Sequence, residues 1–522
     1  MSAGENDLAG IAGKRQIARA AGLVMVFFVL SRLLGLAREM IIGARFGTSA
    51  DLDAYLAAFR LPDLLFQLVA GGALGSAFIP TFTGYLADGD REGAWRLASG
   101  VANLVVVIMT AVAILAAVLA PWLVQKIIAP GFDPAQQVLA ARLMRLMLVT
   151  PVVFGVSGLV MGALNAHQHF LWPAAAPIVY NLSIVGGALA LASNLGVTGL
   201  AIGVVIGAVL HLLVQVPGLV RFKARYWPVL TLHDPGVREV GRLMAPRVLG
   251  LAAVQVNFLI NTVLASGLTE GSLSALNFAW LMMLLPQGVF AQAVATAAFP
   301  TFSALVARGE ADEMRHTLSA TLRAIFFLSV PAAVGLLVLR VPLIQALFQR
   351  GAFEASSTEA VAWALAFYAL GLPAHAGIEV VARAFYALHD THTPVVISVV
   401  AMGLNVVLSL VLIGPLLHGG LALANTVATT LELLGMMILI RRRLGGIGGR
   451  QLIHASGRVV LAALLMGGVL WAALSLAGEE INQGGALVKA GGGILLGAVV
   501  YLGVSWAVGV RELQAVGQLI RR

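Results

Sequence analysis

Long apolar stretches alternate with short polar segments along the whole of this 522-residue chain. Each stretch runs for about 20 residues or more, which lets a helix cross the roughly 30 Å of hydrocarbon in a bilayer. About fourteen such stretches lie between residues 17 and 509. The pattern predicts an all-α polytopic membrane protein with about fourteen transmembrane helices.

The composition agrees with a membrane protein. Hydrophobic residues make up 60% of the chain, charged residues make up 11%, and the mean hydropathy is +0.94. Soluble domains carry about 25% charged residues. The chain has no cysteine, which excludes disulfides, thiolate metal sites and thiol nucleophiles.

The net charge of +9 comes from basic residues that concentrate in alternate loops. This distribution is typical of cytoplasmic loops and argues against a nucleic-acid-binding surface. With an even number of spans, both termini would lie in the cytoplasm. We interpret residues 1–16 as a retained cytoplasmic tail, because no small-residue cleavage site marks a signal peptide.

The chain also repeats itself. Pro80 and Pro300 lie in similar segments 220 residues apart, and Gly131 and Gly351 are separated by the same distance. An offset that spans six helices predicts two parallel six-helix repeats around a central cavity, which is typical of transporters. The expected divisions are a tail at 1–16, an N-lobe at 17–225, a C-lobe at 226–445, and two extra helices with a cytoplasmic tail at 446–522.

The first predicted span carries charges within SRLLGLAREMIIGARFG, residues 31–47. Charges in hydrocarbon are costly and usually face a cavity or a partner. On a helix, Arg32 and Glu39 fall within about 20° of each other, as do Arg38 and Arg45. We expect Arg32 and Arg38 to line the cavity and Arg45 to lie at the membrane interface. Guanidinium groups there suit a phosphate or pyrophosphate, and would equally suit a carboxylate.

Other embedded charges leave two interpretations open. Asp53 and Asp63 begin the second span, which also carries Arg60, so both a helix-start role and a cavity role remain for the two acids. Glu379 and Arg383 are four residues apart, a spacing that favours an ion pair within one helix.

Sequence signatures of enzymes are missing. The chain has no Walker A sequence and no HExxH, and no spacing of Ser, His and Asp indicates a triad, so we expect no catalytic activity. HDTH at 389–392 precedes a proline and reads as a loop rather than a metal site. Gly199, Gly203 and Gly207 form a helix-packing stripe.

Several of these segments resemble the lipid II flippase family (MurJ/MviN) of the MOP exporter superfamily. They include SRLLGLAREMIIGARFG, ADLDAYLAAFRLPDLL, LFQRGAF and RAFYALHDTHTP, and the resemblance covers essentially the whole chain. It implies alternating-access transport of an undecaprenyl-pyrophosphate-linked disaccharide-pentapeptide across the bacterial inner membrane for peptidoglycan synthesis. It also implies a substrate site at Arg32, Arg38, Glu39 and Asp53.

The resemblance further implies partners and a driving force. The partners would be a lipid-linked cell-wall precursor, membrane lipids and cell-wall synthesis proteins, with no nucleic acid. No cofactor is expected, although Na⁺ or the membrane potential would drive transport. A weak ion site would use Asn261, which stands where some relatives carry an aspartate, together with Asn405 and Ser409 from a later span.

This sequence departs from the family pattern at basic positions. Phe66 and Gln67 replace a basic pair in the second span, and Trp280 and Leu281 replace an acid and an arginine in the eighth. Each lost charge about 5 Å from a phosphate removes roughly 3 kcal/mol of attraction before desolvation is counted. Two alternatives therefore stay open: a divergent paralogue that moves another lipid-linked glycan or lipid, and a transport-inactive envelope scaffold.

Overall fold

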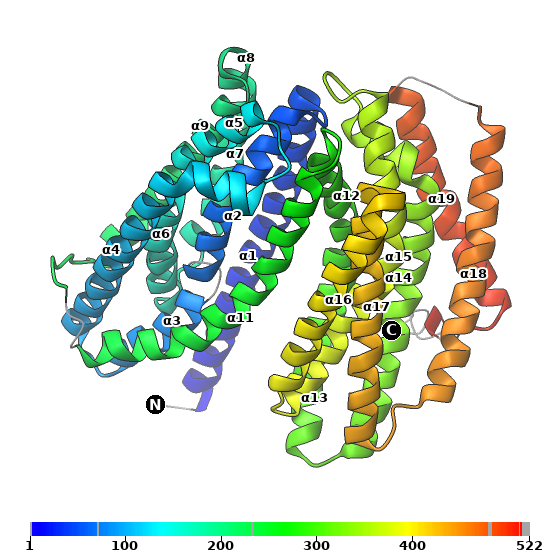
Figure 1. Cartoon of the computed structure of the whole chain (residues 1–522). Coiled ribbons are helices and arrows are strands. Elements are labelled where there is room, and N and C mark those ends of the chain that lie inside the picture. The colour runs from blue at the N-terminus through cyan, green and yellow to red at the C-terminus, as the bar shows by residue number, and fades with distance from the viewer. Residues whose placement is uncertain (1–2, 70–72, 231–233, 479–482, 511, 514–522) are drawn as a thin grey trace. The chain divides into compact units, whose positions relative to one another are not determined.

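The computed structural model describes residues 3–69, 73–230, 234–478, 483–510 and 512–513 (Figure 1). Every regular element within these ranges is a helix. Eleven helices among the described residues are long and apolar enough to cross a membrane. The prediction of an all-α polytopic membrane protein is confirmed, and the count of fourteen spans stays a prediction.

The described helices follow one another with short connections, and three of them are brief π-helical turns labelled η. Up to residue 266 they are α1 (Ala3–Phe46), α2 (Ala50–Val69), α3 (Ala73–Ala87), α4 (Arg91–Leu123), η1 (Val124–Ile128), α5 (Pro134–Met147), α6 (Val149–Ala166), α7 (Leu171–Gly186), η2 (Gly187–Leu191), α8 (Ala192–Leu195), α9 (Val197–Leu213), α10 (Val216–Arg221) and α11 (Pro235–Ser266). After it they are α12 (Ser272–Pro286), η3 (Gln287–Ala291), α13 (Gln292–Ala307), α14 (Ala311–Phe348), α15 (Ala355–Ala387), α16 (His392–Leu416), α17 (His418–Leu444), α18 (Gly449–Leu476) and α19 (Gln483–Ala507).

The chain divides into two compact units. The first comprises Met1–Phe46 and Ala50–Val263, and the second comprises Gly47–Ser49 and Leu264–Arg522. The division falls inside α11, between Val263 and Leu264, because it is set by which residues contact one another. The lobe boundaries expected from the repeat, at 225 and 445, stay predictions.

Small residues let the helices of the first unit approach closely. A Cβ atom on Gly203 of α9 would lie 2.9 Å from the carbonyl oxygen of Ser183 and 3.0 Å from the Cα of Gly187. A Cβ atom on Gly207 would lie 2.8 Å from the Tyr180 ring. The predicted glycine stripe is therefore confirmed as a packing face of α9 against α7 and η2.

In the second unit α15 packs against α12, α14 and α17, and its buried face is almost wholly apolar. The helices α18 and α19 pack on α14 through a cluster that includes Phe327, Met466 and Tyr501. The Tyr501 hydroxyl donates to the carbonyl of Phe327 at 2.8 Å. The last two helices therefore belong structurally to the second unit.

The repeat reappears in the backbone at four pairs of helix ends. A residue with positive φ follows one helix in the first half and the equivalent helix in the second, with an offset of 220 to 222 residues. The pairs are Gly89 (φ 79°) with Gly309 (φ 70°), Gln168 (57°) with His389 (57°), Gly196 (55°) with Leu417 (53°), and Lys223 (53°) with Gly445 (71°). Positive φ at a helix C-terminus ends the helix and redirects the chain, so both halves turn at the same points.

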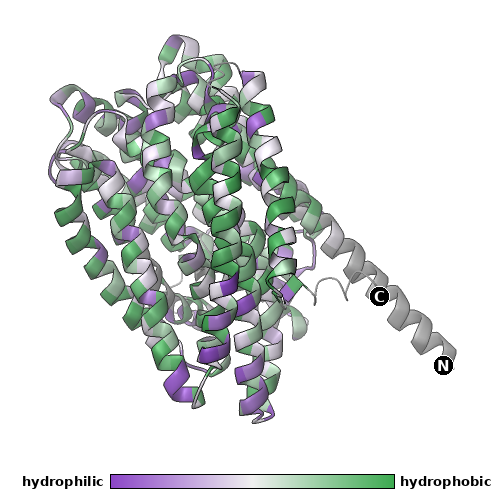
Figure 2. Cartoon of the chain, turned by 90° about the vertical axis from the view of Figure 1, so that its right-hand side faces the viewer, coloured by the Kyte–Doolittle hydropathy of each residue, from purple (hydrophilic) through white to green (hydrophobic). Residues whose placement is uncertain are grey.

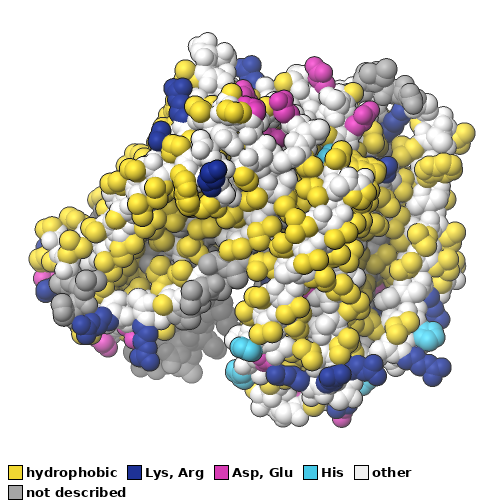
Figure 3. Space-filling view, viewed as in Figure 1, with side chains coloured by type: hydrophobic (Ala, Val, Ile, Leu, Met, Phe, Trp, Pro, Cys, Tyr) yellow, Lys and Arg dark blue, Asp and Glu magenta, His cyan; other side chains and the backbone are white. Residues whose placement is uncertain are grey.

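Apolar and polar side chains separate along the helix axes. Hydrophobic colour dominates the middles of the helices and polar colour their ends (Figure 2). In the second unit, Lys, Arg and His side chains gather at the lower end of the helices, beneath a broad hydrophobic surface (Figure 3). This pattern is that of a membrane-embedded bundle with one basic polar end.

Candidate functional site

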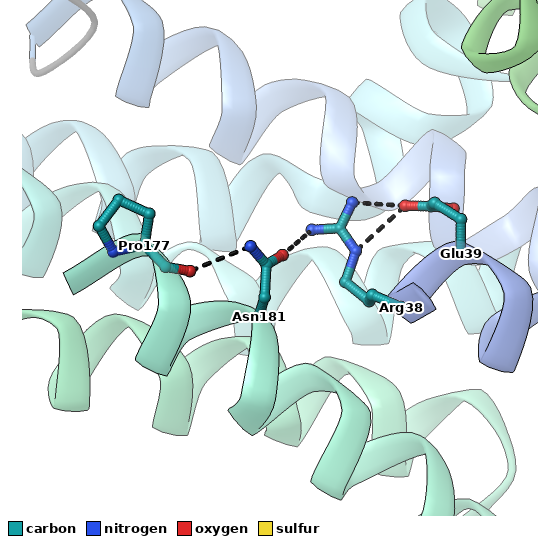
Figure 4. A network of polar contacts seen from close by, with 4 residues as sticks. All are labelled: Arg38, Glu39, Pro177 and Asn181. Atoms are coloured by element: carbon teal, nitrogen blue, oxygen red, sulfur yellow. Dashed lines mark hydrogen bonds and ion pairs between the residues drawn. The ribbon is translucent and has the colours of Figure 1, made fainter. Parts of the chain in front are cut away.

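Arg38 is the centre of a polar network inside the first unit (Figure 4). Its Nη1 donates to Asn181 Oδ1 at 3.0 Å, and Asn181 Nδ2 donates to the carbonyl of Pro177 at 3.0 Å. Its Nε donates to Glu39 Oε1 at 3.1 Å, and its Nη2 forms an ion pair with the same oxygen. The network joins α1 to α7 and leaves 26% of the Arg38 side chain exposed.

The sequence placed Arg38 and Glu39 on different helix faces, because neighbouring residues are about 100° apart. The structure brings their side chains together nonetheless, since both are long enough to reach across that angle. The partner Asn181 was missed. Its only signal in the sequence is an asparagine within an apolar span, which usually faces another helix.

Arg32 lies on the same helix but outside this network. Its side chain is exposed, and its guanidinium carbon lies 5.2 Å from the centre of the Phe28 ring. No salt bridge to Arg32 occurs within the described parts of the chain. Arg32 thus supplies an uncompensated positive charge from an apolar segment.

Two further charged residues, Arg45 at the end of α1 and Asp53 at the start of α2, differ in burial. Arg45 is exposed and donates to the carbonyl of Leu189 at 3.3 Å. Asp53 on α2 is 2% exposed, so its carboxylate is enclosed by protein. Buried carboxylates require partners, which favours a structural contribution from Asp53 within the first unit.

A second polar cluster joins α2 to α11. Arg60 Nε donates to Thr262 Oγ1 at 2.8 Å, and its guanidinium carbon lies 5.8 Å from the centre of the Phe258 ring. Asp63 accepts hydrogen bonds from Gln67 and Gln255 and lies near Arg60. Residues of this cluster line a cavity of about 70 Å³.

The sequence identified Arg60 and Asp63 as embedded charges without connecting them to α11. Their spacing of three residues is the only local signal for their proximity. Gln67, one of the replacements in the family pattern, acts here as a donor to Asp63.

In the second unit, Trp280 on α12 packs against two rings from α15. Its ring centre lies 5.2 Å from that of Tyr368 and 5.4 Å from that of His375, both nearly perpendicular. His375 Nε2 and Asn425 Oδ1 are 3.1 Å apart. Trp280, one of the departures from the family pattern, is therefore part of an aromatic cluster.

Glu379 and Arg383 form the ion pair within α15 that their spacing predicted, with Arg383 Nη1 2.5 Å from Glu379 Oε2. Gln292 from α13 completes a closed triangle. It donates to Glu379 Oε1 at 2.9 Å and accepts from Arg383 Nη2 at 3.2 Å. The pair is thus neutralised and shared between two helices.

The residues of the predicted ion site are not all in one unit. Asn405 and Ser409 lie on α16 at 2% and 0% exposure, and their polar side-chain atoms have no hydrogen-bond partner within the described parts of the chain. Asn261 lies on α11 in the first unit, and its Oδ1 also lacks a partner. Among the described residues no group of three or more His, Asp or Glu could hold a metal ion.

The HDTH segment is a helix cap, as its loop position suggested. Asp390 Oδ1 accepts from the backbone N–H groups of His392 at 3.1 Å and Thr393 at 2.9 Å, and Oδ2 lies 2.7 Å from Arg443 Nη2. Hydrogen bonds from Thr393, together with the Arg443 charge, hold the pKa of Asp390 below its usual value. Through these contacts of Asp390, the HDTH segment stabilises the turn between α15 and α16.

Comparison with known proteins identifies relatives along most of the chain. The family model described as "Lipid II flippase MurJ" matches residues 42–485. A "Probable lipid II flippase MurJ" from Haemophilus influenzae is 32% identical over 483 residues, covering 87% of this chain and 91% of that protein. A "Lipid II flippase MurJ" from Burkholderia cenocepacia is 32% identical over 433 residues, covering 81% and 84%.

Solved structures show the same architecture. A structure titled "Lipid II flippase MurJ, inward closed conformation" superposes with a TM-score of 0.80 at 25% identity, covering 94% of this chain and 99% of the other. An inward-facing multidrug resistance transporter of the MATE family superposes with a TM-score of 0.67 at 14% identity, covering 81% and 98%. At 14% identity, the likeness to the MATE-family transporter shows a shared fold and nothing about function.

Proposed function

Since this chain belongs to the lipid II flippase MurJ family, we propose that it moves lipid II from the inner to the outer leaflet of the bacterial inner membrane for peptidoglycan synthesis. The observation that carries the proposal is the match to curated flippases over more than four fifths of the chain. The activity is transport by alternating access, without a catalytic step. The basic ends of the helices support a topology with both termini in the cytoplasm.

Arg32 and Arg38 would hold the pyrophosphate of the substrate in two different ways. Arg32 has no acidic partner among the described residues, so its charge is free to attract an anion. Arg38 is already paired with Glu39. A pyrophosphate would have to exchange with the Glu39 carboxylate, which keeps Arg38 neutralised when no substrate is bound.

The Arg38 network is suited to this exchange. Asn181 fixes the Nη1 edge of the guanidinium from α7, while Glu39 occupies the opposite edge. Guanidinium groups bind phosphate through two parallel N–H donors. Departure of Glu39 would expose two such donors without reorienting Arg38.

A monovalent cation is one candidate for coupling. The side-chain oxygens of Asn405 and Ser409 on α16, which have no hydrogen-bond partner among the described residues, fit the preference of Na⁺ for oxygen ligands. Both groups are neutral, so we expect weaker Na⁺ binding than at a site that includes a carboxylate. Transport that depends on the membrane potential and is indifferent to Na⁺ would exclude this site as the coupling element.

Complementation of a strain depleted of its lipid II flippase tests the function. We expect the wild-type chain to restore growth, and Arg32→Ala to abolish rescue at an unchanged membrane level. Loss of a charge about 5 Å from a phosphate removes roughly 3 kcal/mol, or more than a hundredfold in binding. Arg45→Ala is the matched control on the same helix and should rescue fully.

Failure of the wild-type chain to rescue, with correct membrane insertion, would overturn lipid II as the cargo. The Trp280 cluster favours one second candidate, a different polyprenyl-linked glycan, because aromatic rings replace charges there. Translocation of such a lipid, but not of lipid II, in reconstituted vesicles would establish it. Translocation of any lipid-linked substrate would exclude an inactive scaffold.

A further inference from the structure

A groove of about 850 Å³ lies at the polar end of the second unit, between the start of α14 and the start of α18. Its walls carry Arg315, Ser319 and Arg323 from α14, and Gly448 and Arg450 from the other side. None of these residues belongs to the site described above. We call this space the α14–α18 groove.

The loop that enters the groove is built from glycine. Gly445, Gly446 and Gly448 have φ values of 71°, 148° and 62°, and α18 begins at Gly449. Within the part of the chain that the structure describes, no side chain caps this helix start. Backbone N–H groups at an uncapped helix N-terminus, preceded by left-handed residues, form a concavity that favours anions.

Ser319 points to a ligand independently of this helix end. It is 4% exposed, its Oγ has no hydrogen-bond partner among the described residues, and it lines the groove. A Cβ atom on Gly448 would lie 3.3 Å from that Oγ. A buried hydroxyl without a hydrogen-bond partner destabilises the protein unless a ligand or a water molecule forms a hydrogen bond with it.

The charges of the groove favour an anion. Arg450 is exposed and forms no ion pair within the described residues, and a Cβ atom on Gly445 would lie 3.6 Å from Arg315 Nη2. Arg315 Nη1 is paired at 2.8 Å with Asp312, whose side chain is 84% exposed. Such exposed pairs contribute little and exchange readily.

Two acidic residues of the groove weaken its attraction for an anion. Asp312 and Glu313 also line the groove, and Arg323 Nε lies 2.9 Å from Glu512 Oε1 in a neighbouring hollow. Arg450 lines both spaces. The side of the groove nearest the glycine loop therefore carries Arg450 and Arg315, with Ser319 between α14 and the loop.

We propose that the α14–α18 groove binds a phosphate group, presented by an anionic phospholipid of the cytoplasmic leaflet. The phosphate oxygens would accept from the first N–H groups of α18, the Ser319 hydroxyl and the Arg450 guanidinium. The groove lies between the starts of α14 and α18. Basic side chains gather at the lower end of the helices of the second unit, beneath its hydrophobic surface (Figure 3). Ile453 and Leu464 of α18 are 72% and 61% exposed, so acyl chains can lie beside the headgroup.

Titration of the intact, detergent-solubilised protein tests this site. The probes are short-chain phosphatidylglycerol, short-chain phosphatidylcholine and inorganic phosphate, and the readout is the ligand-dependent rise in unfolding temperature. We expect saturable binding of phosphatidylglycerol, weakened about tenfold by Arg450→Gln and measurably by Ser319→Ala. Arg442→Gln, an exposed arginine outside the groove, is the matched control and should bind as the wild type does.

The outcomes separate the sources of phosphate. Equal weakening by Arg442→Gln and Arg450→Gln, or no saturable binding of any probe, would overturn the site. Inorganic phosphate binding with the same dependence on Arg450 and Ser319, without phosphatidylglycerol binding, would support the phosphate site and overturn the lipid as its source. Unfolding temperatures without ligand show whether each variant is folded.

Discussion

Arg38 on α1 and Asn181 on α7, 143 positions apart in the chain, are joined by a hydrogen bond of 3.0 Å between Nη1 and Oδ1. The bond fixes one edge of a guanidinium whose other edge meets Glu39. The two helices pack against each other within one unit. A positioning residue thus comes from a helix that carries no charge of its own.

Asn181→Ala should lower the rate of lipid II translocation about tenfold, because a hydrogen bond to a charged group contributes about 1.5–3 kcal/mol. Arg38 would keep its charge but lose its orientation. The measurement is transport in vesicles with equal amounts of protein. Ser183→Ala, which removes a bond made within the same helix at 2.9 Å to the Val179 carbonyl, is the control and should leave transport intact.

Glu39→Gln should tighten binding of the anionic headgroup and slow its release, since the competing carboxylate is gone. We expect a lower apparent KM and a lower maximal rate in vesicle transport. A variant with unchanged KM would show that Glu39 does not compete with substrate. Because the change leaves Arg38 without its counter-ion, the unfolding temperature should fall as well.

Asp390→Asn should destabilise the turn between α15 and α16 by about 0.3–1 kcal/mol at pH 7, because asparagine keeps the capping oxygen but loses the charge that faces Arg443 and the start of α16. The pKa of Asp390 is depressed in the folded protein, so its contribution is present above the ordinary aspartate value, near 4. It is lost as pH falls through the depressed value. Chemical denaturation of the two proteins should therefore give a gap that is constant above about pH 5 and closes below pH 4; a gap that persists at low pH would contradict this.

Gly203→Ala should destabilise the first unit by about 1–3 kcal/mol, because the added methyl meets backbone atoms that cannot move aside. Gly186→Ala on α7 is the matched control. A Cβ atom there has nothing within 4 Å, so the change should be neutral or slightly stabilising. Unfolding temperatures of the purified proteins measure both effects, and equal losses would argue against close packing at Gly203.

Leu417→Gly should stabilise the protein by about 1 kcal/mol. Leu417 has φ 53° and ψ −133°, a region in which only glycine is comfortable. Its counterpart in the first half, Gly196, has φ 55° and ψ −142°. The side chain is 47% exposed, so its loss costs little burial. Leu416→Gly, in the last helical position, should destabilise instead.

Hydropathy and the repeat predicted most of the fold. Apolar stretches determine which segments become membrane helices, because a buried backbone must satisfy its hydrogen bonds locally. The offset near 220 residues, visible at Pro80 and Pro300, reappears at the helix ends marked by Gly89 and Gly309. These properties are local or periodic, so the sequence contains them directly.

The site depended on the tertiary structure. The sequence identified Arg32 and Arg38 as embedded charges, but whether each is paired depends on which helix packs beside it. Only folding brought Asn181 to Arg38, Gln292 to Glu379, and Ser319 beneath the glycine loop. A side chain's partner is set by contacts between distant segments, which no local pattern encodes; the sequence determined where the charges are, and the packing of the helices decided which of them remain free.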